Sequence, residues 1–389
     1  MRTSNYPIVY LAVVFLALFA FFACGDEDDE ILSSNVEMEE ATIPRTVLFY
    51  MAGDNSLSSY VSSNLQLIKQ GIRQDGLNNG NLLVFSDTKS GSPQLFQLTM
   101  EGDTLQQIEV ETYDESLSSG SVETLGTVID KVITDFPAES YGLVLWSHAT
   151  GWLPEDGKSY LTRAFAVDNG TDYMELNDLA ETLSSYQFDF ILFDACYMAA
   201  AEVAYALRNS ADYIIGSPTE ILANGFPYDD IIGMMFANEA DVQGMAEAFF
   251  DCYEDSSGTV ALIQCDAMDA LAASCREVFV DKTEEELFAI SVDDLQVLEY
   301  LTGTYHALYD FDDYVSRLAT DEQYTVFQEC LEVALPYKAS TPTSLYSYNG
   351  GTSIALDKYS GLSIYVPQED LIALNEWYKG LAWYQAVYE

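Results

Sequence analysis

The stretch FDFILFDACYMAAAEVAYALR, residues 188–208, leads from an apolar run through an acid and a thiol into an alanine-rich segment. Five of its first six residues are apolar, which is typical of a strand that is covered on both faces of a sheet. Asp194 and Cys196 follow where this strand ends, and the pattern predicts a helix that begins at Tyr197. The positive end of that helix would favour a thiolate at Cys196.

The same pattern of a buried strand with a polar end recurs along the chain, at 46–57, 81–87, 141–152, 212–218 and 257–266. A hairpin is expected at 93–113, and apolar residues at helical spacing indicate helices between the strands. This alternation predicts an α/β fold with a mostly parallel sheet sandwiched by helices. Functional groups gather at the carboxyl ends of such strands, and Asp54, His148 and Cys196 each lie at one.

The chain divides into four parts by composition. Residues 1–23 carry Arg2 and then, from Ile8 to Ala23, 16 uncharged and mostly apolar residues. This run is too short for a comfortable membrane span and fits a secretory signal peptide. Residues 24–44 hold eight acids and no base and indicate a solvated tether. Residues 45–266 carry the alternating pattern and are expected to form the main domain, whose strand ends carry the candidate functional residues. Residues 267–389 are expected to form a smaller α+β subdomain packed on its sheet.

The stretch around Cys24 resembles the lipobox of bacterial lipoproteins, whose cysteine carries the lipid. Acids directly after that cysteine resemble the surface-export signal of Bacteroidetes lipoproteins, although an ordinary flexible linker would have the same composition. The resemblance implies an exported protein that is lipid-anchored to the bacterial outer membrane, at its periplasmic face or at the cell surface. Contact with the membrane would be through this N-terminal anchor only.

Charge excludes some partners. Without the signal peptide the chain has 14 basic and 63 acidic residues, a formal charge of −49. Nucleic acid is excluded because a phosphate-binding surface must be basic. A strongly negative surface instead attracts cationic ligands. The acid run YDFDDY (309–314) does not fit the ligand spacing of an EF-hand, so the sequence assigns no metal site.

Cysteine and histidine are scarce. After Cys24 the chain has five cysteines, whose spacing follows no disulfide framework and no zinc pattern; they are Cys196, Cys252, Cys265, Cys275 and Cys330. The two histidines are His148 and His306, and His148 lies 48 residues before Cys196, one strand-helix-strand unit earlier. Two consecutive parallel strands would bring an imidazole and a thiol to one edge, as a cysteine nucleophile requires. A buried structural cysteine and a hydrogen-bonded histidine are the alternative.

Four stretches, in order along residues 46–367, resemble the clostripain-like cysteine peptidases. They are YMAGDNSL, LVLWSHATGW, the quoted cysteine block, and SGLSIYVP. The resemblance implies a caspase–gingipain-type fold with a Cys/His dyad and hydrolysis after Arg or Lys in a basic peptide or protein. It implies no cofactor, although calcium helps some relatives.

Carried over residue by residue, the resemblance makes Cys196 the nucleophile and His148 the general acid for the leaving amine. Asp194 would line the specificity pocket and pair with a substrate Arg or Lys; its alternative is to cap the following helix. Its charge would also raise the pKa of Cys196. The family's autoactivation implies cleavage in the loop 153–170, after Lys158 first or after Arg163.

One position departs from the family pattern. The family carries Gly after the histidine, and its N–H forms the oxyanion hole with the N–H of the cysteine. This chain has Ala149, and alanine resists a positive φ, so a left-handed turn there would distort the hole. The alternative function is therefore a catalytically impaired relative that binds basic peptides or a surface partner. A peptidase of different specificity is a third possibility.

Overall fold

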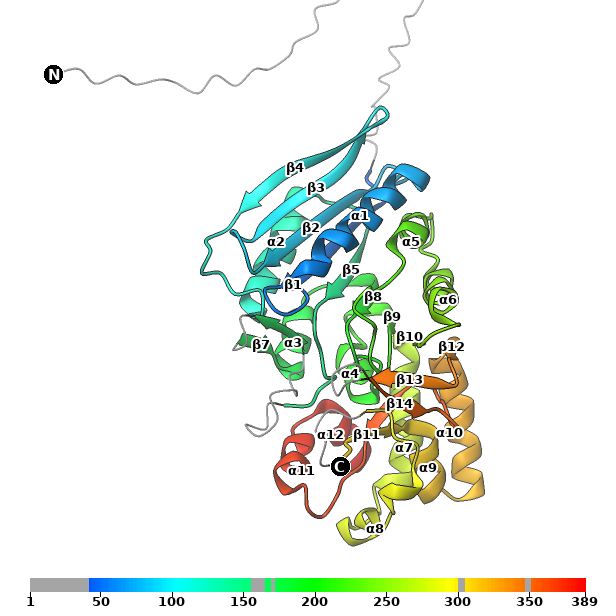
Figure 1. Cartoon of the computed structure of the whole chain (residues 1–389). Coiled ribbons are helices and arrows are strands. Elements are labelled where there is room, and N and C mark those ends of the chain that lie inside the picture. Colours follow the sequence, from blue (N-terminus) through cyan, green and yellow to red (C-terminus); the bar gives the residue numbers. More distant parts are fainter. Residues whose placement is uncertain (1–41, 155–164, 169–171, 300–304, 347–350) are drawn as a thin grey trace, which may run out of the picture. The chain divides into compact units, whose positions relative to one another are not determined.

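The structure, a computed structural model, describes residues 42–154, 165–168, 172–299, 305–346 and 351–389, which form one compact unit (Figure 1). A nine-stranded sheet runs through it in the order β12-β10-β9-β8-β5-β1-β2-β3-β4. These strands are β1 (Arg45–Gly53), β2 (Asn81–Thr88), β3 (Gln94–Glu101), β4 (Thr104–Thr112), β5 (Ser140–Trp146), β8 (Phe188–Asp194), β9 (Ala211–Gly216), β10 (Thr259–Gln264) and β12 (Tyr337–Ser340).

The centre of the sheet is parallel and its two ends are antiparallel. Strands β2, β1, β5, β8 and β9 pair in parallel, as the apolar runs predict. β10 pairs antiparallel with β9, so this apolar run does not continue the parallel series. The predicted hairpin is β3–β4. The predicted α/β sheet flanked by helices is confirmed.

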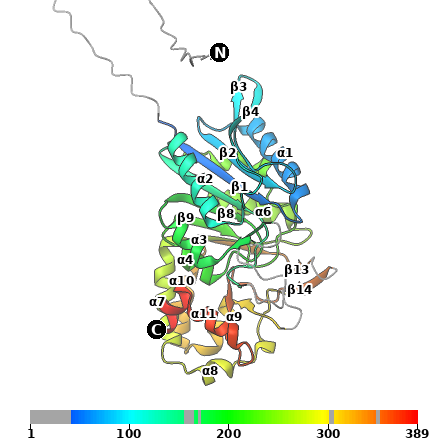
Figure 2. The same cartoon turned by 90° about the vertical axis from the view of Figure 1, so that its left-hand side faces the viewer.

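Helices cover both faces of this sheet (Figures 1 and 2). One face packs against α1 (Ser58–Asp75), α5 (Tyr228–Met235) and α6 (Val242–Tyr253). The other packs against α2 (Val122–Asp135), α3 (Leu176–Leu183) and α4 (Ala201–Leu207). Successive side chains of β1 alternate between the two cores, with Phe49 in one and Tyr50 in the other. This strand is buried along its whole length, which explains its continuous apolar run.

The part after residue 266 adds helices α7 (Met268–Phe279), α8 (Glu284–Phe288), α9 (Phe311–Leu318), α10 (Asp321–Ala334), α11 (Ile372–Lys379) and α12 (Ala382–Tyr388). It also contains two small antiparallel pairs, β11 (Leu308–Asp310) with β15 (Ser363–Tyr365) and β13 (Thr343–Tyr346) with β14 (Thr352–Ala355). α12 packs against α4 and α7, and β12 forms an edge of the central sheet. The division at residue 266 stays a prediction.

The predicted signal peptide, Cys24 and the tether as far as Ala41 lie outside the described residues. Of the helices in the described part, none has both the length and the apolar character needed to cross a membrane.

Candidate active site

His148 and Cys196 lie at the same edge of the sheet. β5 and β8 are adjacent and parallel, and Trp146 is aligned with Asp194 at their ends. The Ser147 N–H donates to the Asp194 carbonyl oxygen at 3.4 Å, which extends this alignment by one residue. His148 and Cys196 each follow two residues after the aligned pair, and both are half-buried. The register therefore brings an imidazole and a thiol to neighbouring positions on one rim.

Cys196 lies in a turn and not at a helix terminus. α4 begins at Ala201, so the prediction of a helix beginning at Tyr197 is wrong, and no helix dipole acts on the thiol. Tyr197 has a φ of 63°, in the left-handed region that side chains other than glycine rarely adopt. Its N–H donates to the Thr219 carbonyl oxygen at 3.0 Å, which holds this turn against the segment after β9.

The Cys196 thiol is bonded to the backbone of Ile221. Its sulfur lies 3.6 Å from the Ile221 carbonyl oxygen and 3.3 Å from the Ile221 nitrogen. Burial of the sulfur, followed by the charge of Glu220, raises the pKa of Cys196 to about 12, and Asp194 adds to the shift. The predicted effect of Asp194 on the thiol is therefore present but is smaller than the effects of burial and of Glu220.

His148 is neutral in this site. Burial lowers its pKa to about 4, since a low-dielectric surrounding disfavours the imidazolium. Its Nε2 atom lies 2.7 Å from the hydroxyl oxygen of Ser56. The resting pair is therefore a thiol and a neutral imidazole, so nucleophilic attack requires the thiol proton to move to the imidazole.

Asp194 is buried with its side chain toward the loop before α5. Its Oδ2 atom accepts hydrogen bonds from the Phe226 N–H at 3.1 Å and from the Tyr228 hydroxyl at 2.7 Å. Burial raises the pKa of Asp194 to about 6, although these two bonds favour the charged form. Gly225 has a φ of 71°, and a Cβ atom there would lie 2.3 Å from Oδ2. The helix-capping alternative for Asp194 is wrong, because the N-cap of α4 is Ala200.

Ala149 fits its position without strain. Among the described residues, the non-glycine residues with positive φ are Asn78, Asn79, Ala166 and Tyr197. Ala149 therefore has no positive φ, so the left-handed turn that would have distorted the oxyanion hole is absent at this residue. It bridges to Phe165, and the Ala166 N–H donates to the His148 carbonyl oxygen at 3.1 Å. The N–H of Ala149 itself donates to no acceptor among the described residues.

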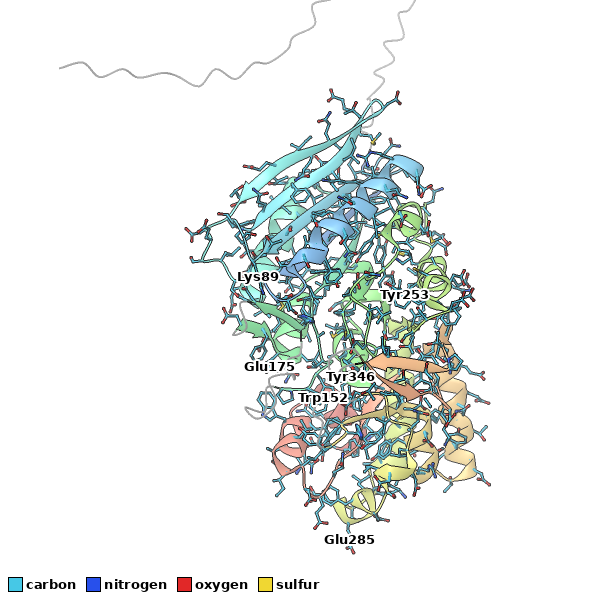
Figure 3. All side chains as sticks on the ribbon, viewed as in Figure 1. Lys89, Trp152, Glu175, Tyr253, Glu285 and Tyr346 are labelled. Atoms are coloured by element: carbon cyan, nitrogen blue, oxygen red, sulfur yellow. The ribbon has the colours of Figure 1, made fainter. Side chains whose placement is uncertain are left out.

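The processing residues Lys158 and Arg163 lie outside the described residues, but both flanks of their loop are fixed. Trp152, labelled in Figure 3, is 1% exposed and packs against Tyr365 and Tyr378 with ring centroids 5.3 and 5.4 Å away. Phe165 on the other flank is fully buried in β6 (Phe165–Asp168), which pairs with β7 (Asp172–Met174).

Asp54, the third polar strand end, does not join the dyad. It lies beside Asp168, which raises the pKa of Asp54 together with the larger effect of burial. Burial likewise raises the pKa of Asp87 to about 6, and Asp168 adds to that shift. Within the described ranges, no three His, Cys, Asp or Glu residues are arranged to hold a metal ion. The five cysteines after the tether are free thiols, of which Cys252 is exposed.

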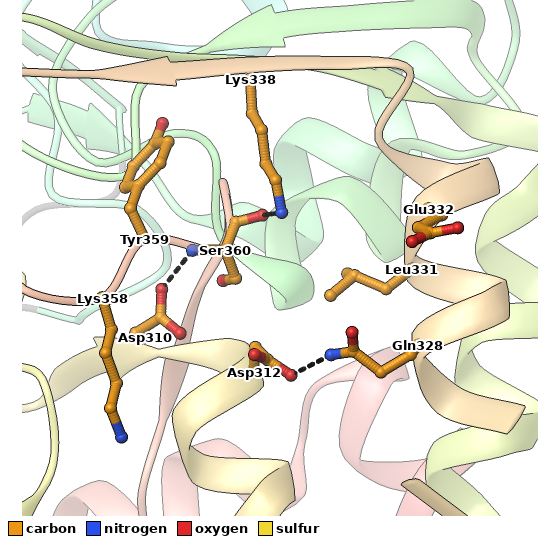
Figure 4. A pocket seen from close by; sticks show the side chains of 9 residues that line it. All are labelled: Asp310, Asp312, Gln328, Leu331, Glu332, Lys338, Lys358, Tyr359 and Ser360. Carbon is orange, nitrogen blue, oxygen red and sulfur yellow. Dashed lines mark hydrogen bonds between the residues drawn. The ribbon is translucent and has the colours of Figure 1, made fainter. Parts of the chain in front are cut away.

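A pocket of about 370 Å³ lies in the C-terminal part, and neither His148 nor Cys196 lines it (Figure 4). It is lined by Asp310, Asp312, Gln328, Leu331, Glu332, Lys338, Lys358, Tyr359 and Ser360. Several of its polar groups are already bonded to one another. The Lys338 ammonium donates to the Ser360 carbonyl oxygen at 2.9 Å, and Asp310 caps α9 through the Asp313 N–H. These bonds hold the lining of the pocket together.

Sequence reasoning missed two groups that contact the dyad, Ser56 and Ile221. Ser56 lies two residues after Asp54, at the polar end of the first predicted strand. Its place at that strand end is the sequence feature that could have indicated a role. Ile221 acts through its backbone, so its side chain carries no signal.

Comparison with known proteins identifies a family profile, two similar structures and one curated relative. The profile of the clostripain family matches residues 49–389. An inactive zymogen C11 protease from Parabacteroides distasonis has a similar structure, with a TM-score of 0.85 at 60% identity, covering 90% of this chain and 99% of that one. A secreted C11 cysteine protease from Bacteroides thetaiotaomicron, in complex with an irreversible peptide inhibitor, has a TM-score of 0.79 at 31% identity, covering 88% and 98%.

Clostripain from Hathewaya histolytica is 26% identical over 242 residues, which are 53% of this chain and 46% of the relative. The chain thus matches about half the length of this curated relative. The family profile, in contrast, extends from β1 to the last residue and includes both strand ends that carry the dyad. This chain belongs to the clostripain family of cysteine peptidases.

Proposed function

We propose that this protein is an exported cysteine endopeptidase that hydrolyses peptide bonds after Arg or Lys, with Cys196 as the nucleophile and His148 as the proton carrier. The observation that carries the proposal is the register of β5 and β8, which brings both residues two positions beyond one aligned pair. Family membership and the similarity to an inhibitor-bound protease support the same reaction.

The mechanism begins with a neutral dyad. The Cys196 sulfur attacks the scissile carbonyl carbon while the thiol proton passes to His148, and the carbonyl oxygen becomes an oxyanion. The N–H groups of Ala149 and Cys196 would form the oxyanion hole. The His148 imidazolium then gives its proton to the leaving amine, the C–N bond breaks, and a thioester remains. Water, deprotonated by His148, cleaves the thioester and restores the thiol.

Asp194 supplies the preference for a cationic side chain. Its Oδ2 atom is engaged by Phe226 and Tyr228, while its Oδ1 atom accepts no hydrogen bond from the described residues. A guanidinium or ammonium at this oxygen would form a charge-assisted hydrogen bond. The same cation would offset the charge of Asp194, which is one of the smaller causes of the raised pKa of Cys196, so substrate binding would assist ionisation of the nucleophile.

Asp194→Asn is expected to lower kcat/KM for an Arg or Lys substrate by about 10- to 100-fold, the loss of a hydrogen bond to a charged group. A substrate with Leu at the same position should change little. Asp87→Asn is the matched control, because Asp87 is also buried at this sheet edge and also has a pKa raised to about 6. Unchanged selectivity for Arg over Leu in Asp194→Asn would contradict the assignment.

The same variant gives a pH test. Because the pKa of Asp194 is raised to about 6, the carboxylate is charged above pH 6 and neutral below it. The kcat/KM of the wild type for an Arg substrate should therefore fall as the pH drops through about 6. In Asp194→Asn this decline should disappear.

We further propose that the chain is anchored through a lipid on Cys24 and is activated by cleavage after Lys158 or, failing that, Arg163. The similar proteases that are described as secreted and as an inactive zymogen support export and activation. Mass spectrometry of the protein purified from membranes should find an acylated terminus at Cys24 and a second terminus at Ser159 or Ala164. An unmodified Cys24, or an active enzyme without a terminus in this loop, would refute the corresponding half.

The alternative, a catalytically impaired relative that binds basic peptides, is favoured by one observation. The thiol is bonded to Ile221 and its pKa is about 12, so the resting site holds little thiolate. The activity of the Cys196→Ala variant and the labelling of Cys196 by an Arg-directed reagent distinguish this alternative from the peptidase.

A further inference from the structure

Three polar residues follow three neighbouring strands at the rim that carries the dyad. The strand order β8-β5-β1 places Cys196, His148 and Ser56 in the same order, because each follows the end of its strand. The hydroxyl oxygen of Ser56 lies 2.7 Å from Nε2 of His148. The imidazole therefore has a hydroxyl on the β1 side, and its neighbour on the β8 side is the strand end that carries the nucleophile.

Ser56 is itself exposed, but its chain neighbours Asn55 and Leu57 are held by a hydrogen-bond network. Asn55 is 7% exposed, and its amide nitrogen donates to the Ala52 carbonyl oxygen at 2.9 Å and to the Ser147 hydroxyl at 3.4 Å. The Ser147 hydroxyl donates to the same Ala52 oxygen at 2.8 Å. The Leu57 N–H donates to the Asn55 side chain at 2.8 Å. The network ties the end of β1 to the residue directly before His148, so the backbone that carries Ser56 is anchored beside the imidazole.

We propose that Ser56 is a positioning residue for His148. The Ser56 hydroxyl oxygen accepts a hydrogen bond from the Nε2–H group of His148, which leaves Nδ1 as the nitrogen that exchanges a proton with Cys196. The inference rests on the proposed dyad. The hydroxyl must be the acceptor during the reaction, because an imidazolium carries hydrogen on both nitrogens and offers no lone pair. A third group that orients the base is a general requirement of such nucleophile–base pairs.

The hydroxyl contributes in two ways. It selects one tautomer of the neutral ring, and it stabilises the imidazolium that forms when the thiol proton arrives. Both effects act on the chemical step and leave substrate contacts unchanged. Ser56→Ala is therefore expected to lower kcat by about 10- to 100-fold, as for the loss of a hydrogen bond to a charged group. The KM should stay within about twofold of the wild-type value, because the hydroxyl acts on the imidazole and not on the substrate.

The experiment compares Ser56→Ala, Ser56→Thr and Ser59→Ala with an Arg substrate. Ser56→Thr keeps the hydroxyl and should retain kcat within about threefold, a margin below one lost hydrogen bond to a charged group. Ser59→Ala, an exposed serine in the next helical turn, should be indistinguishable from wild type. A fall in kcat for Ser56→Ala of less than about twofold would overturn the proposal. An equal loss in Ser56→Thr would also overturn it, since packing would then account for the effect.

Nitrogen NMR provides a readout that does not depend on activity. The chain has two histidines, so His306 serves as the internal reference. In the wild type at pH 7 the His148 signals should report the Nε2–H tautomer, and Ser56→Ala should shift them toward a mixture while those of His306 stay unchanged. A bare Nε2 in the wild type would refute the inference. If the tautomer depends on Ser56 but the protein cleaves no peptide, the positioning role stands and the proposed function fails.

Discussion

Cys196→Ala is expected to lower kcat/KM for an Arg or Lys substrate by about 10⁵-fold or more, to the level left by binding and the oxyanion hole alone. The variant removes the atom that forms the thioester. It should fold normally, because the side chain is half-buried and, among the residues that the structure describes, its thiol bonds the Ile221 backbone alone. Activity is measured with a fluorogenic peptide, and a thermal melt checks folding. Cys252→Ala, which removes the exposed free thiol, is the matched control and should be fully active.

Thiol labelling separates the peptidase from the impaired relative. With the pKa of Cys196 raised to about 12, iodoacetamide at pH 7.5 should modify Cys252 first. A chloromethyl ketone that carries Arg should instead modify Cys196 before Cys252, because binding of its cation at Asp194 would position the reactive carbon next to the Cys196 sulfur. Absence of both turnover and Arg-directed labelling in the processed wild type would favour the impaired relative.

Ala149→Gly should alter kcat/KM by no more than about threefold, because Ala149 already has an ordinary φ.

His148→Ala is expected to lower kcat by about 10³-fold, within the range for removal of a general acid–base group. The thiol then has no acceptor for its proton, and the leaving amine has no donor. His306→Gln is the matched control, because His306 is the second histidine of the chain and contacts the Glu299 carbonyl oxygen in the C-terminal part. Loss of activity in both variants alike would indicate a structural effect.

The pH profile adds a signed test of the same residue. Burial lowers the pKa of His148 to about 4, so the ring is neutral above pH 4 and protonated below it. Only the neutral ring accepts the thiol proton, so activity on a Leu substrate, which does not depend on Asp194, should persist down to about pH 4 and then fall. A decline centred near pH 6.5 would show that the imidazole is not desolvated.

The parallel centre of the sheet and the meeting of two strand ends were predictable from sequence. Continuous apolar runs report burial on both faces, and equal strand ends place His148 and Cys196 on one rim. The direction of β10 was not predictable, because an apolar run carries no information on its direction. The left-handed Tyr197 was equally hidden, since tertiary contacts such as the bond to Thr219 impose a conformation that its side chain disfavours.

The contacts of Ser56 and Ile221 with the dyad depend on how loops fold over the sheet. The interaction of Ile221 uses backbone atoms, which every residue possesses. Ser56 lies within a run of polar residues, and only the Asn55 network selects it as the neighbour of His148. The effect of alanine at position 149 depends on the backbone angle φ of that residue, and the residue type alone does not determine this angle.

The protonated state of Cys196 has a consequence for the durability of the enzyme. Peroxides and disulfides attack thiolates far more readily than thiols, and reducing agents are scarce outside the cytoplasm. A sulfur that stays protonated until a cationic side chain arrives would survive unrepaired in an oxidising environment. The bond to Ile221 and the charges of Glu220 and Asp194 would then make the resting thiol less reactive and so slow its oxidation.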